Sequence, residues 1–498
     1  MPPEGGLRRS ASWLAVAGAV EYGLQFAMPV ILVRCLDETT FGQYRLLWLL
    51  AGTMLAIAPA FMPQSLFYFL ARAEAGQKQQ VIGNVLIYLI GAGVVAGVVA
   101  SGWNPWLQEA ARHLSVQTHG MSALFLGIWV VASMLDVLPT ADANARWQAR
   151  AIIGLAFFRT LLLAAAALVT ADIVWVVAAM LVVATVKIAL LAFYIRTHRE
   201  QGKLRWSATT LKRQLTYALP FAVGNGLFLL RIQADQWVVV SMLSPALYAT
   251  FSIAATVLPI ATLIRQPVNN ALLPRLNSAH ADGNAAEAVR LIARSNGAAA
   301  LLLLPVVGIL LVTASEVVEI MYTSRYRQAA PVMQVYLIGM MMSTFAVGHV
   351  LSALGKGRFA ALNSACCLVL SVVLSIVGVR EFGLVGAATG SVASLAFGIL
   401  WSLWVVSRTL GVAMHRLLEW RILLPAFAGS VFGMAGVIAL SQAVAWHPLP
   451  MLLAKGAVYL AMFIPFFLLA GGWNQINLLL GRVRTQPGIS KGEAHETA

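Results

Sequence analysis

Charged residues are scarce in this sequence. Only 11% of its 498 residues are Asp, Glu, Lys or Arg, whereas about 25% is usual in soluble domains. Hydrophobic residues make up 60% of the chain, which is more than the interior of a water-soluble fold accommodates. The scarcity of charge therefore excludes an ordinary soluble domain and indicates a membrane protein.

Cysteine and catalytic motifs are also nearly absent. The three cysteines, Cys35 and the adjacent Cys366 and Cys367, form neither an even disulfide framework nor the spacing of a metal site. The sequence contains no Gly-x-x-x-x-Gly-Lys-Ser/Thr loop for nucleotide phosphates and no His-Glu-x-x-His pair for zinc. We therefore expect no cofactor, no metal and no catalytic residue, and we predict that the protein is not an enzyme.

Long apolar stretches distinguish the two folds that span membranes, because only helices and closed barrels satisfy every backbone group in lipid. Stretches such as Val81 to Ser101 approach the ~20 residues of a spanning helix and lack the alternation of a barrel strand. The sequence predicts an all-α polytopic protein with fourteen spans, near residues 12–33, 43–70, 81–102, 121–139, 151–171, 173–195, 216–242, 247–272, 297–314, 331–354, 360–379, 384–407, 421–442 and 449–472. Only Ala171-Asp172 separates the fifth span from the sixth. Only Arg380-Glu381-Phe382-Gly383 separates the eleventh span from the twelfth.

The distribution of Lys and Arg supports this count. With the N-terminus inside, the cytoplasmic connections and tails hold 23 of the 34 basic residues, the outer connections hold 6 and the spans hold 5. Basic residues concentrate in cytoplasmic loops, so the net charge of +15 has a topological explanation, and no nucleic acid partner is expected. We predict a multi-pass membrane protein with both termini in the cytoplasm.

A long basic loop, Arg196 to Arg213, divides the spans into two groups. We expect an N-terminal bundle in residues 1–200, a basic cytoplasmic linker in 201–215, a C-terminal bundle in 216–410, an extra helix pair in 411–472 and a cytoplasmic tail in 473–498. Tyr22-Gly-Leu-Gln-Phe-Ala and Tyr217-Ala-Leu-Pro-Phe-Ala begin the two groups and predict a parallel internal repeat. Helical spacing from Asn284 to Arg294 predicts a short interfacial helix.

Four segments together resemble a known family. They are Pro29-Val-Ile-Leu-Val-Arg-Cys-Leu-Asp-Glu-Thr-Thr-Phe-Gly-Gln-Tyr44, Asn270-Ala-Leu-Leu-Pro-Arg-Leu276, Leu354-Gly-Lys-Gly-Arg358 and Gly383-Leu-Val-Gly-Ala-Ala-Thr389. In this combination the chain is similar to the Wzx-type oligosaccharide flippases, of the superfamily (MOP) that also holds MATE drug exporters and lipid II flippases. The resemblance implies two six-helix bundles, an extra helix pair, alternating access and a location in the bacterial inner membrane. It also implies a substrate of undecaprenyl-diphosphate-linked sugar repeat units for O-antigen, capsule or exopolysaccharide, with a polymerase and glycosyltransferases as pathway partners.

Charged residues at span centres are costly and usually face a cavity or a partner. An arginine fork suits a diphosphate, because it donates paired hydrogen bonds and stays charged. We predict that the cavity for diphosphate and sugar is lined by Arg231, Arg265, Asn269, Asn270, Arg159, Lys187 and Asn225. Arg231 has an alternative role as a structural partner of Asp235 one turn later. Arg159 and Lys187 have alternative structural roles, which include pairing with Asp136.

Two carboxylates are candidates for coupling transport to an ion. Glu21 lies four residues before Gln25 on the first span, and Asp235 lies on the seventh; a buried carboxylate binds a proton or a cation. The alternative for Glu21 is a hydrogen-bonded structural group. Two other functions stay open: a MATE-like cation-coupled drug exporter, for which acidic cavity residues should dominate, and a lipid II flippase. Five basic residues against Glu21, Asp136 and Asp235 inside the spans favour an anionic substrate.

Overall fold

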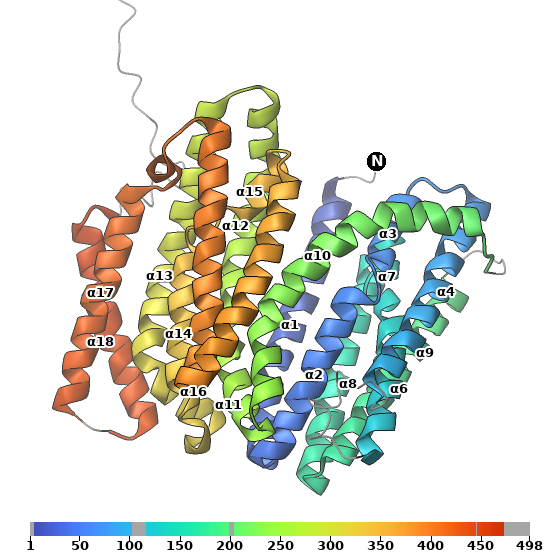
Figure 1. Cartoon of the computed structure of the whole chain (residues 1–498), viewed down its shortest axis with the longest axis horizontal. Coiled ribbons are helices and arrows are strands. Elements are labelled where there is room, and N and C mark those ends of the chain that lie inside the picture. The colour runs from blue at the N-terminus through green and yellow to red at the C-terminus, as the bar shows by residue number, and fades with distance from the viewer. Residues whose placement is uncertain (1–3, 102–115, 199–203, 445, 473–498) are drawn as a thin grey trace, which may run out of the picture. The chain divides into compact units, whose positions relative to one another are not determined.

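The computed structural model describes residues 4–101, 116–198, 204–444 and 446–472, and all regular secondary structure in them is helical (Figure 1). The elements are α1 (Glu4–Cys35), α2 (Glu38–Ile57), α3 (Met62–Leu70), α4 (Ala75–Ala100), α6 (Val116–Ala132), η1 (Ser133–Asp136), α7 (Leu138–Ala141), α8 (Ala145–Thr170), α9 (Ile173–Thr197), α10 (Ala208–Met242), α11 (Pro245–Ala254), η2 (Ala255–Val257), α12 (Leu258–Ala281), α13 (Ala285–Tyr322), η3 (Ser324–Tyr326), α14 (Ala329–Ser343), α15 (Gly348–Ala353), α16 (Gly357–Leu410), η4 (Met414–Leu417), α17 (Trp420–Ala443) and α18 (Pro448–Leu469).

The predicted all-α membrane fold is confirmed. Twelve helical segments of the described chain are long and apolar enough to cross a membrane, and the bent pair α2 and α3 makes thirteen. The bend of 42° falls where Ala60 and Phe61 adopt positive φ, which interrupts the helix. α16 is counted once, although its 54 residues would extend about 81 Å at 1.5 Å per residue, far beyond a bilayer core of about 30 Å. It contains two spans, which gives fourteen.

The two shortest predicted connections lie where the sequence placed them. α8 ends at Thr170, Ala171 adopts the left-handed conformation, and the Asp172 side chain accepts a hydrogen bond from the backbone of Val174 to begin α9. In α16 the chain turns at Gly383, whose φ of 60° and ψ of −135° are not helical. The two arms of α16 then approach backbone to backbone, because a Cβ on Gly378 would collide with the carbonyl of Gly386.

Polar caps mark several helix starts. The Asp37 carboxylate accepts hydrogen bonds from the backbone of Thr39 and Thr40 at the first turn of α2. Burial raises the pKa of Asp37, but these hydrogen bonds outweigh burial and hold that pKa below its ordinary value. Ser207 and Ser244 cap α10 and α11 in the same way. Such caps satisfy backbone N–H groups that have no partner within the helix.

The chain divides into two compact units. The first comprises Met1–Pro259, Ala314–Gly339 and Lys356–Ser402, and the second comprises Ile260–Thr313, Met340–Gly355 and Leu403–Ala498. This division follows contacts, whereas the predicted bundles follow the internal repeat, and those bundles stay a prediction.

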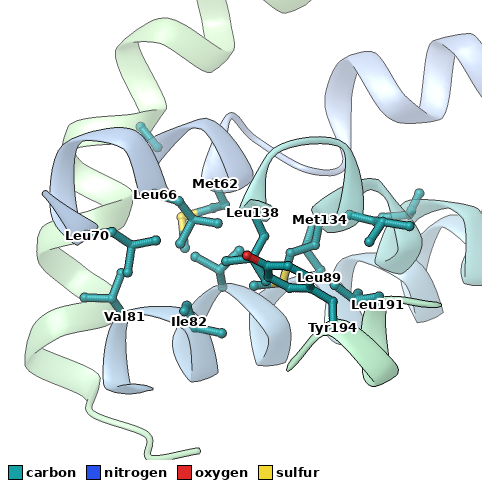
Figure 2. Packing of buried hydrophobic residues seen from close by; sticks show 14 of the residues in the cluster. Met62, Leu66, Leu70, Val81, Ile82, Leu89, Met134, Leu138, Leu191 and Tyr194 are labelled. Carbon is teal, nitrogen blue, oxygen red and sulfur yellow. The ribbon is translucent and has the colours of Figure 1, made fainter. Parts of the chain in front are cut away.

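Each unit has an apolar core. In the first unit, side chains of α3, α4, η1 and α9 meet around Met62, Leu66, Leu89 and Tyr194 (Figure 2). In the second unit, Ala300 and Leu304 of α13 pack against Tyr459 and Phe463 of α18. Glycine allows this packing, because a Cβ on Gly308 would overlap the Tyr459 hydroxyl.

One predicted helix boundary is wrong. The expected short interfacial helix from Asn284 to Arg294 is the first part of α13, which continues without a break to Tyr322. The segment contains no proline or glycine until Gly297, so nothing in it ends a helix before the apolar span begins. α10 likewise begins at Ala208, inside the predicted linker, and the predicted tail at 473–498 lies outside the described residues.

Candidate substrate-binding site

Arg231 lies in the middle of α10 without a carboxylate partner among the described residues. Its guanidinium contacts the Cys367 thiol of α16 and lies over the Phe228 ring, 5.4 Å from the centroid. The Nε atom is buried and has no hydrogen-bond partner. The planar fork therefore retains donor capacity inside the membrane, which an anionic group can use.

Asp235, one turn later on α10, has a different partner from the one proposed for it. Tyr336 of α14 donates a hydrogen bond of 2.7 Å to Asp235 Oδ2, and the Ser391 hydroxyl of α16 is a second partner. The backbone of Gln236 donates to Oδ1. The carboxylate is only 1% exposed, so neutral donors surround it. The structural alternative for Arg231, an ion pair with Asp235, is not formed.

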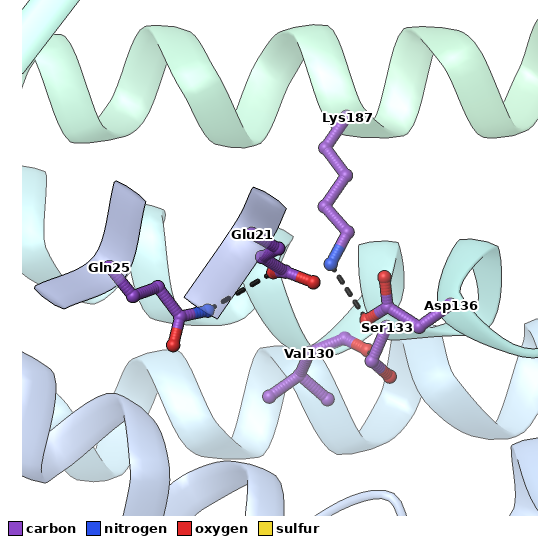
Figure 3. A network of polar contacts seen from close by, with 6 residues as sticks. All are labelled: Glu21, Gln25, Val130, Ser133, Asp136 and Lys187. Carbon is purple, nitrogen blue, oxygen red and sulfur yellow. Dashed lines mark hydrogen bonds and ion pairs between the residues drawn. The ribbon is translucent and has the colours of Figure 1, made fainter. Parts of the chain in front are cut away.

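Lys187 and Asp136 form an ion pair of 2.8 Å in the first unit (Figure 3). Lys187 comes from α9 and Asp136 from η1, and the ammonium also lies 4.4 Å from the centroid of Trp129. The lysine side chain is 9% exposed and the aspartate 55%. Lys187 therefore forms the ion pair with Asp136 that was its alternative, structural role. The partly solvated carboxylate and the indole ring compensate the charge of the buried ammonium.

Arg159 of α8 lies near the same aromatic group. Its guanidinium is 5.7 Å from the centroid of Trp48, and Trp48 packs edge-on against Trp129. Trp48, Phe125, Trp129 and Arg159 line a crevice that is too narrow to hold a water molecule. No carboxylate of the described chain pairs with Arg159, so cation–π contact compensates its charge.

Glu21 and Gln25 are neighbours on α1, as their spacing predicts. Gln25 Nε2 donates a hydrogen bond of 3.1 Å to Glu21 Oε1, and in Figure 3 the Glu21 carboxylate points toward the Lys187 ammonium. Neither residue is fully buried. A partly exposed carboxyl that accepts a hydrogen bond fits both of the roles considered for Glu21, coupling and structure.

Arg265 of α12 lies in the second unit and is only 7% exposed. It donates hydrogen bonds to the backbone carbonyls of Thr344 (3.0 Å) and Ala346 (2.6 Å), and a longer one of 3.5 Å to Asn296 Oδ1. Both carbonyls belong to the break between α14 and α15, where helix hydrogen bonds are missing. Arg265 thus satisfies two backbone carbonyls at a break in a span. To bind a diphosphate, its guanidinium would have to give up these two hydrogen bonds.

The predicted asparagines differ in exposure. Asn225 on α10 and Asn270 on α12 are exposed, so their amides are accessible to a ligand. Asn269 is partly buried, and its Oδ1 has no hydrogen-bond partner. All three amides thus retain capacity to bind polar groups, although the structure places Asn225 in the first unit and the other two in the second.

Sequence analysis missed the neutral partners of the charged groups. Tyr336, Ser391 and Cys367 are more than a hundred residues from the α10 groups they contact. Tyrosine and serine at helical spacing are ordinary packing residues, so nothing local distinguished them. They are identified only by the packing of α14 and α16 beside α10.

Comparison with known proteins identifies the family. Residues 31–331, more than half of the chain, match the family model described as polysaccharide biosynthesis protein. The chain belongs to this family. No curated protein sequence matches the chain.

Several solved structures are similar to this chain over most of its length. The lipid II flippase MurJ, in an inward closed conformation, aligns with a TM-score of 0.70 at 10% identity over 93% of this chain and 99% of its own. An inward-facing MATE family multidrug resistance transporter of the MOP superfamily aligns at 0.64, with 14% identity over 81% and 99%. A MOP transporter from Pyrococcus furiosus, whose binding pocket has reversed polarity, aligns at 0.53, with 14% identity over 81% and 96%. At these identities the likeness shows a shared fold.

Proposed function

We propose that this protein translocates undecaprenyl-diphosphate-linked oligosaccharide repeat units across the bacterial inner membrane by alternating access, for O-antigen, capsule or exopolysaccharide synthesis. The polysaccharide biosynthesis family model supports the pathway, and the likeness to a lipid-linked precursor flippase supports the class of transport. A polymerase and glycosyltransferases are the partners that such a pathway requires, and membrane lipids surround the spans.

The observation that carries the proposal is the free donor capacity of Arg231. A partly buried cation without a carboxylate partner is costly in a membrane, and among the described residues Arg231 contacts the Phe228 ring and the Cys367 thiol. A diphosphate supplies both the charge and the acceptors that the guanidinium lacks. Asn225, exposed two turns earlier on α10, supplies an amide that can hydrogen-bond sugar hydroxyls. Asn269, Asn270, Arg159 and Lys187 remain further proposed contacts.

The site for a coupling ion is proposed at Asp235, with Glu21 as the second candidate. Asp235 is buried with Tyr336 and Ser391 and has no cationic partner among the described residues. An isolated charge in such surroundings is strongly disfavoured, so the carboxyl is stable when it binds a proton or a small cation. Glu21 is less enclosed and already accepts a hydrogen bond from Gln25.

Reconstitution tests the proposed function. The purified chain is placed in proteoliposomes with undecaprenyl-diphosphate oligosaccharide labelled with a fluorophore on the terminal sugar. Translocation is the change in the fraction of label accessible to a membrane-impermeant quencher. We expect the wild-type protein to exchange the headgroup between leaflets, and an exchange rate equal to that of empty liposomes would refute the proposal.

A lipid II flippase is the second candidate, because MurJ has the same fold and its named substrate carries the same diphosphate chemistry. Complementation separates the two. Rescue of surface polysaccharide in a flippase-deficient strain supports the first function, whereas rescue of growth after MurJ depletion supports the second. A MATE-like drug exporter is less favoured, because the positive charge of Arg231, which no carboxylate of the described chain pairs with, repels cations.

A further inference from the structure

α10 exposes two opposite faces, although it lies in a membrane bundle. Leu219 and Val223 are 56% and 55% exposed on one face, and Phe221 and Phe228 are 50% and 45% exposed on the other. With 3.6 residues per turn, positions 217, 221, 225, 228 and 231 lie within about 120° of one another around the helix. Positions 219 and 223 lie on the opposite side.

Only one of these faces suits lipid. The face of Leu219 and Val223 is aliphatic, as expected for contact with acyl chains. The other face holds Asn225 among its aromatic residues and ends at Arg231, and an amide and a guanidinium in contact with hydrocarbon are costly. The aromatic face is therefore better suited to a polar ligand than to acyl chains.

The aromatic face continues from α10 onto α3 within the first unit. The Tyr217 and Tyr68 rings stack with centroids 4.6 Å apart and an angle of 24°, and Phe221 and Phe61 stack at 5.3 Å. Tyr217 also contacts Phe221 at 5.4 Å. These contacts fix the orientation of the rings, while half of Phe221 and more than a third of Tyr68 stay accessible.

Arginine borders this surface at both ends. The Arg72 guanidinium lies 3.9 Å from the centroid of Tyr68, and that of Arg231 lies over Phe228. From Tyr217 to Arg231 the helix rises about 21 Å. The surface therefore combines fixed positive charge at two separated points with apolar ring faces and one amide between them, over a length that suits several linked sugars.

We propose that this surface, the α3–α10 aromatic track (Tyr68, Tyr217, Phe221, Asn225 and Phe228), binds the saccharide part of the lipid-linked substrate. This inference rests on the proposed function. Pyranose rings present apolar C–H faces that pack on aromatic rings and hydroxyls that an amide can bind, and Arg231 binds the diphosphate. A phospholipid headgroup has no such ring faces, and a cationic drug is repelled by both arginines.

The test compares two substrates in proteoliposomes: undecaprenyl diphosphate carrying at least three sugars, and undecaprenyl diphosphate carrying one, each with the same fluorophore. Phe221→Leu keeps an apolar side chain of similar volume but removes the ring. It is expected to lower the initial rate for the oligosaccharide about tenfold, which is the effect of losing roughly one aromatic stacking contact. The rate for the single-sugar substrate is expected to stay within about twofold of wild type.

Two further variants make the comparison specific. Phe221→Tyr restores the ring and is expected to restore the oligosaccharide rate. Leu219→Ala, on the aliphatic face with a similar exposure, is expected to transport both substrates at wild-type rates. The proposed track would be overturned by any of three results. Phe221→Leu could lower the transport rate equally for both substrates, or lower neither rate. Leu219→Ala could lower the oligosaccharide rate as much as Phe221→Leu does. Failure of the wild-type protein to move either substrate would instead overturn the proposed function itself.

Discussion

Tyr336 donates a 2.7 Å hydrogen bond to the Asp235 carboxylate, and this contact leaves Arg231 without its neighbouring acid. Arg231 and Asp235 occupy the same helix at a spacing that allows an ion pair. The competing bond comes from α14, whose tyrosine satisfies the acid without neutralising its charge. One residue on a distant helix thereby separates an anion-binding group from a candidate coupling group.

Replacing Arg231 tests its contact with the diphosphate. Arg231→Gln removes the charge and is expected to lower the rate of headgroup translocation at least about tenfold, because charge-assisted hydrogen bonds contribute about 1.5–3 kcal/mol. Arg231→Lys keeps the charge but not the fork and should give an intermediate rate. Arg290→Ala is the control, because Arg290 is a solvent-exposed partner of Glu287. Wild-type rates in Arg231→Gln would contradict the assignment.

Replacing Asp235 tests the coupling proposal. In Asp235→Asn the amide oxygen can still accept the bond from Tyr336, so the protein should fold and exchange substrate down its gradient. Accumulation of substrate driven by a proton or sodium gradient should be lost. The measurement compares both modes in the same proteoliposomes, with Glu21→Gln as the parallel variant. If gradient-driven accumulation survives in Asp235→Asn but not in Glu21→Gln, the site is Glu21.

Arg265→Ala is expected to weaken the fold as well as transport. The substitution leaves the carbonyls of Thr344 and Ala346 without their donor, and a buried unsatisfied group costs about 1–3 kcal/mol. The midpoint of thermal unfolding in detergent should fall in Arg265→Ala and fall less in Arg265→Lys, which retains a donor. An unchanged unfolding midpoint together with lost transport would show that Arg265 acts on the substrate alone.

Gly378→Ala tests the hairpin of α16. The added methyl group would collide with the Gly386 backbone, and overpacking of this kind costs about 1–3 kcal/mol. A lower unfolding midpoint is expected. Gly91→Ala is the matched control, because nothing lies within 4 Å of a Cβ at that helical position, and alanine there should be neutral or stabilising. Equal midpoints for the two variants would argue against close contact of the two arms.

Asp37→Ala removes the cap of α2 and is expected to cost about 1 kcal/mol of stability. The pKa of Asp37 is lowered in the folded protein, so the folded state binds this proton less tightly than the unfolded state does. The contribution is therefore complete above the unfolded pKa of about 3.9 and is lost as pH falls through the lower folded value. Unfolding midpoints of wild type and Asp37→Ala should converge in that acid range, and a constant difference at all pH values would contradict the role of the charge.

The sequence by itself determined the membrane fold, because apolar run length and backbone hydrogen bonding permit few alternatives. The connections at Ala171-Asp172 and Gly383 could be predicted from the sequence, because a helix cap and a glycine turn depend only on adjacent residues. The spacing of Glu21 and Gln25 was also sufficient to predict their contact. The continuity of α13 from Ala285 past Arg294 into the apolar span was missed, because the absence of a helix-breaking residue is a weak signal.

Only the tertiary structure decided which charges remain available. Sequence spacing allowed Arg231 to pair with Asp235, and it left Arg265 without a visible partner. In the structure Asp235 binds Tyr336, whereas Arg265 binds the carbonyls of a broken helix. Partners of a charged side chain come from whichever helices pack beside it, and backbone carbonyls become acceptors only where a helix breaks. Neither condition is encoded within one span, so the chemistry of these arginines depended on how the helices assemble.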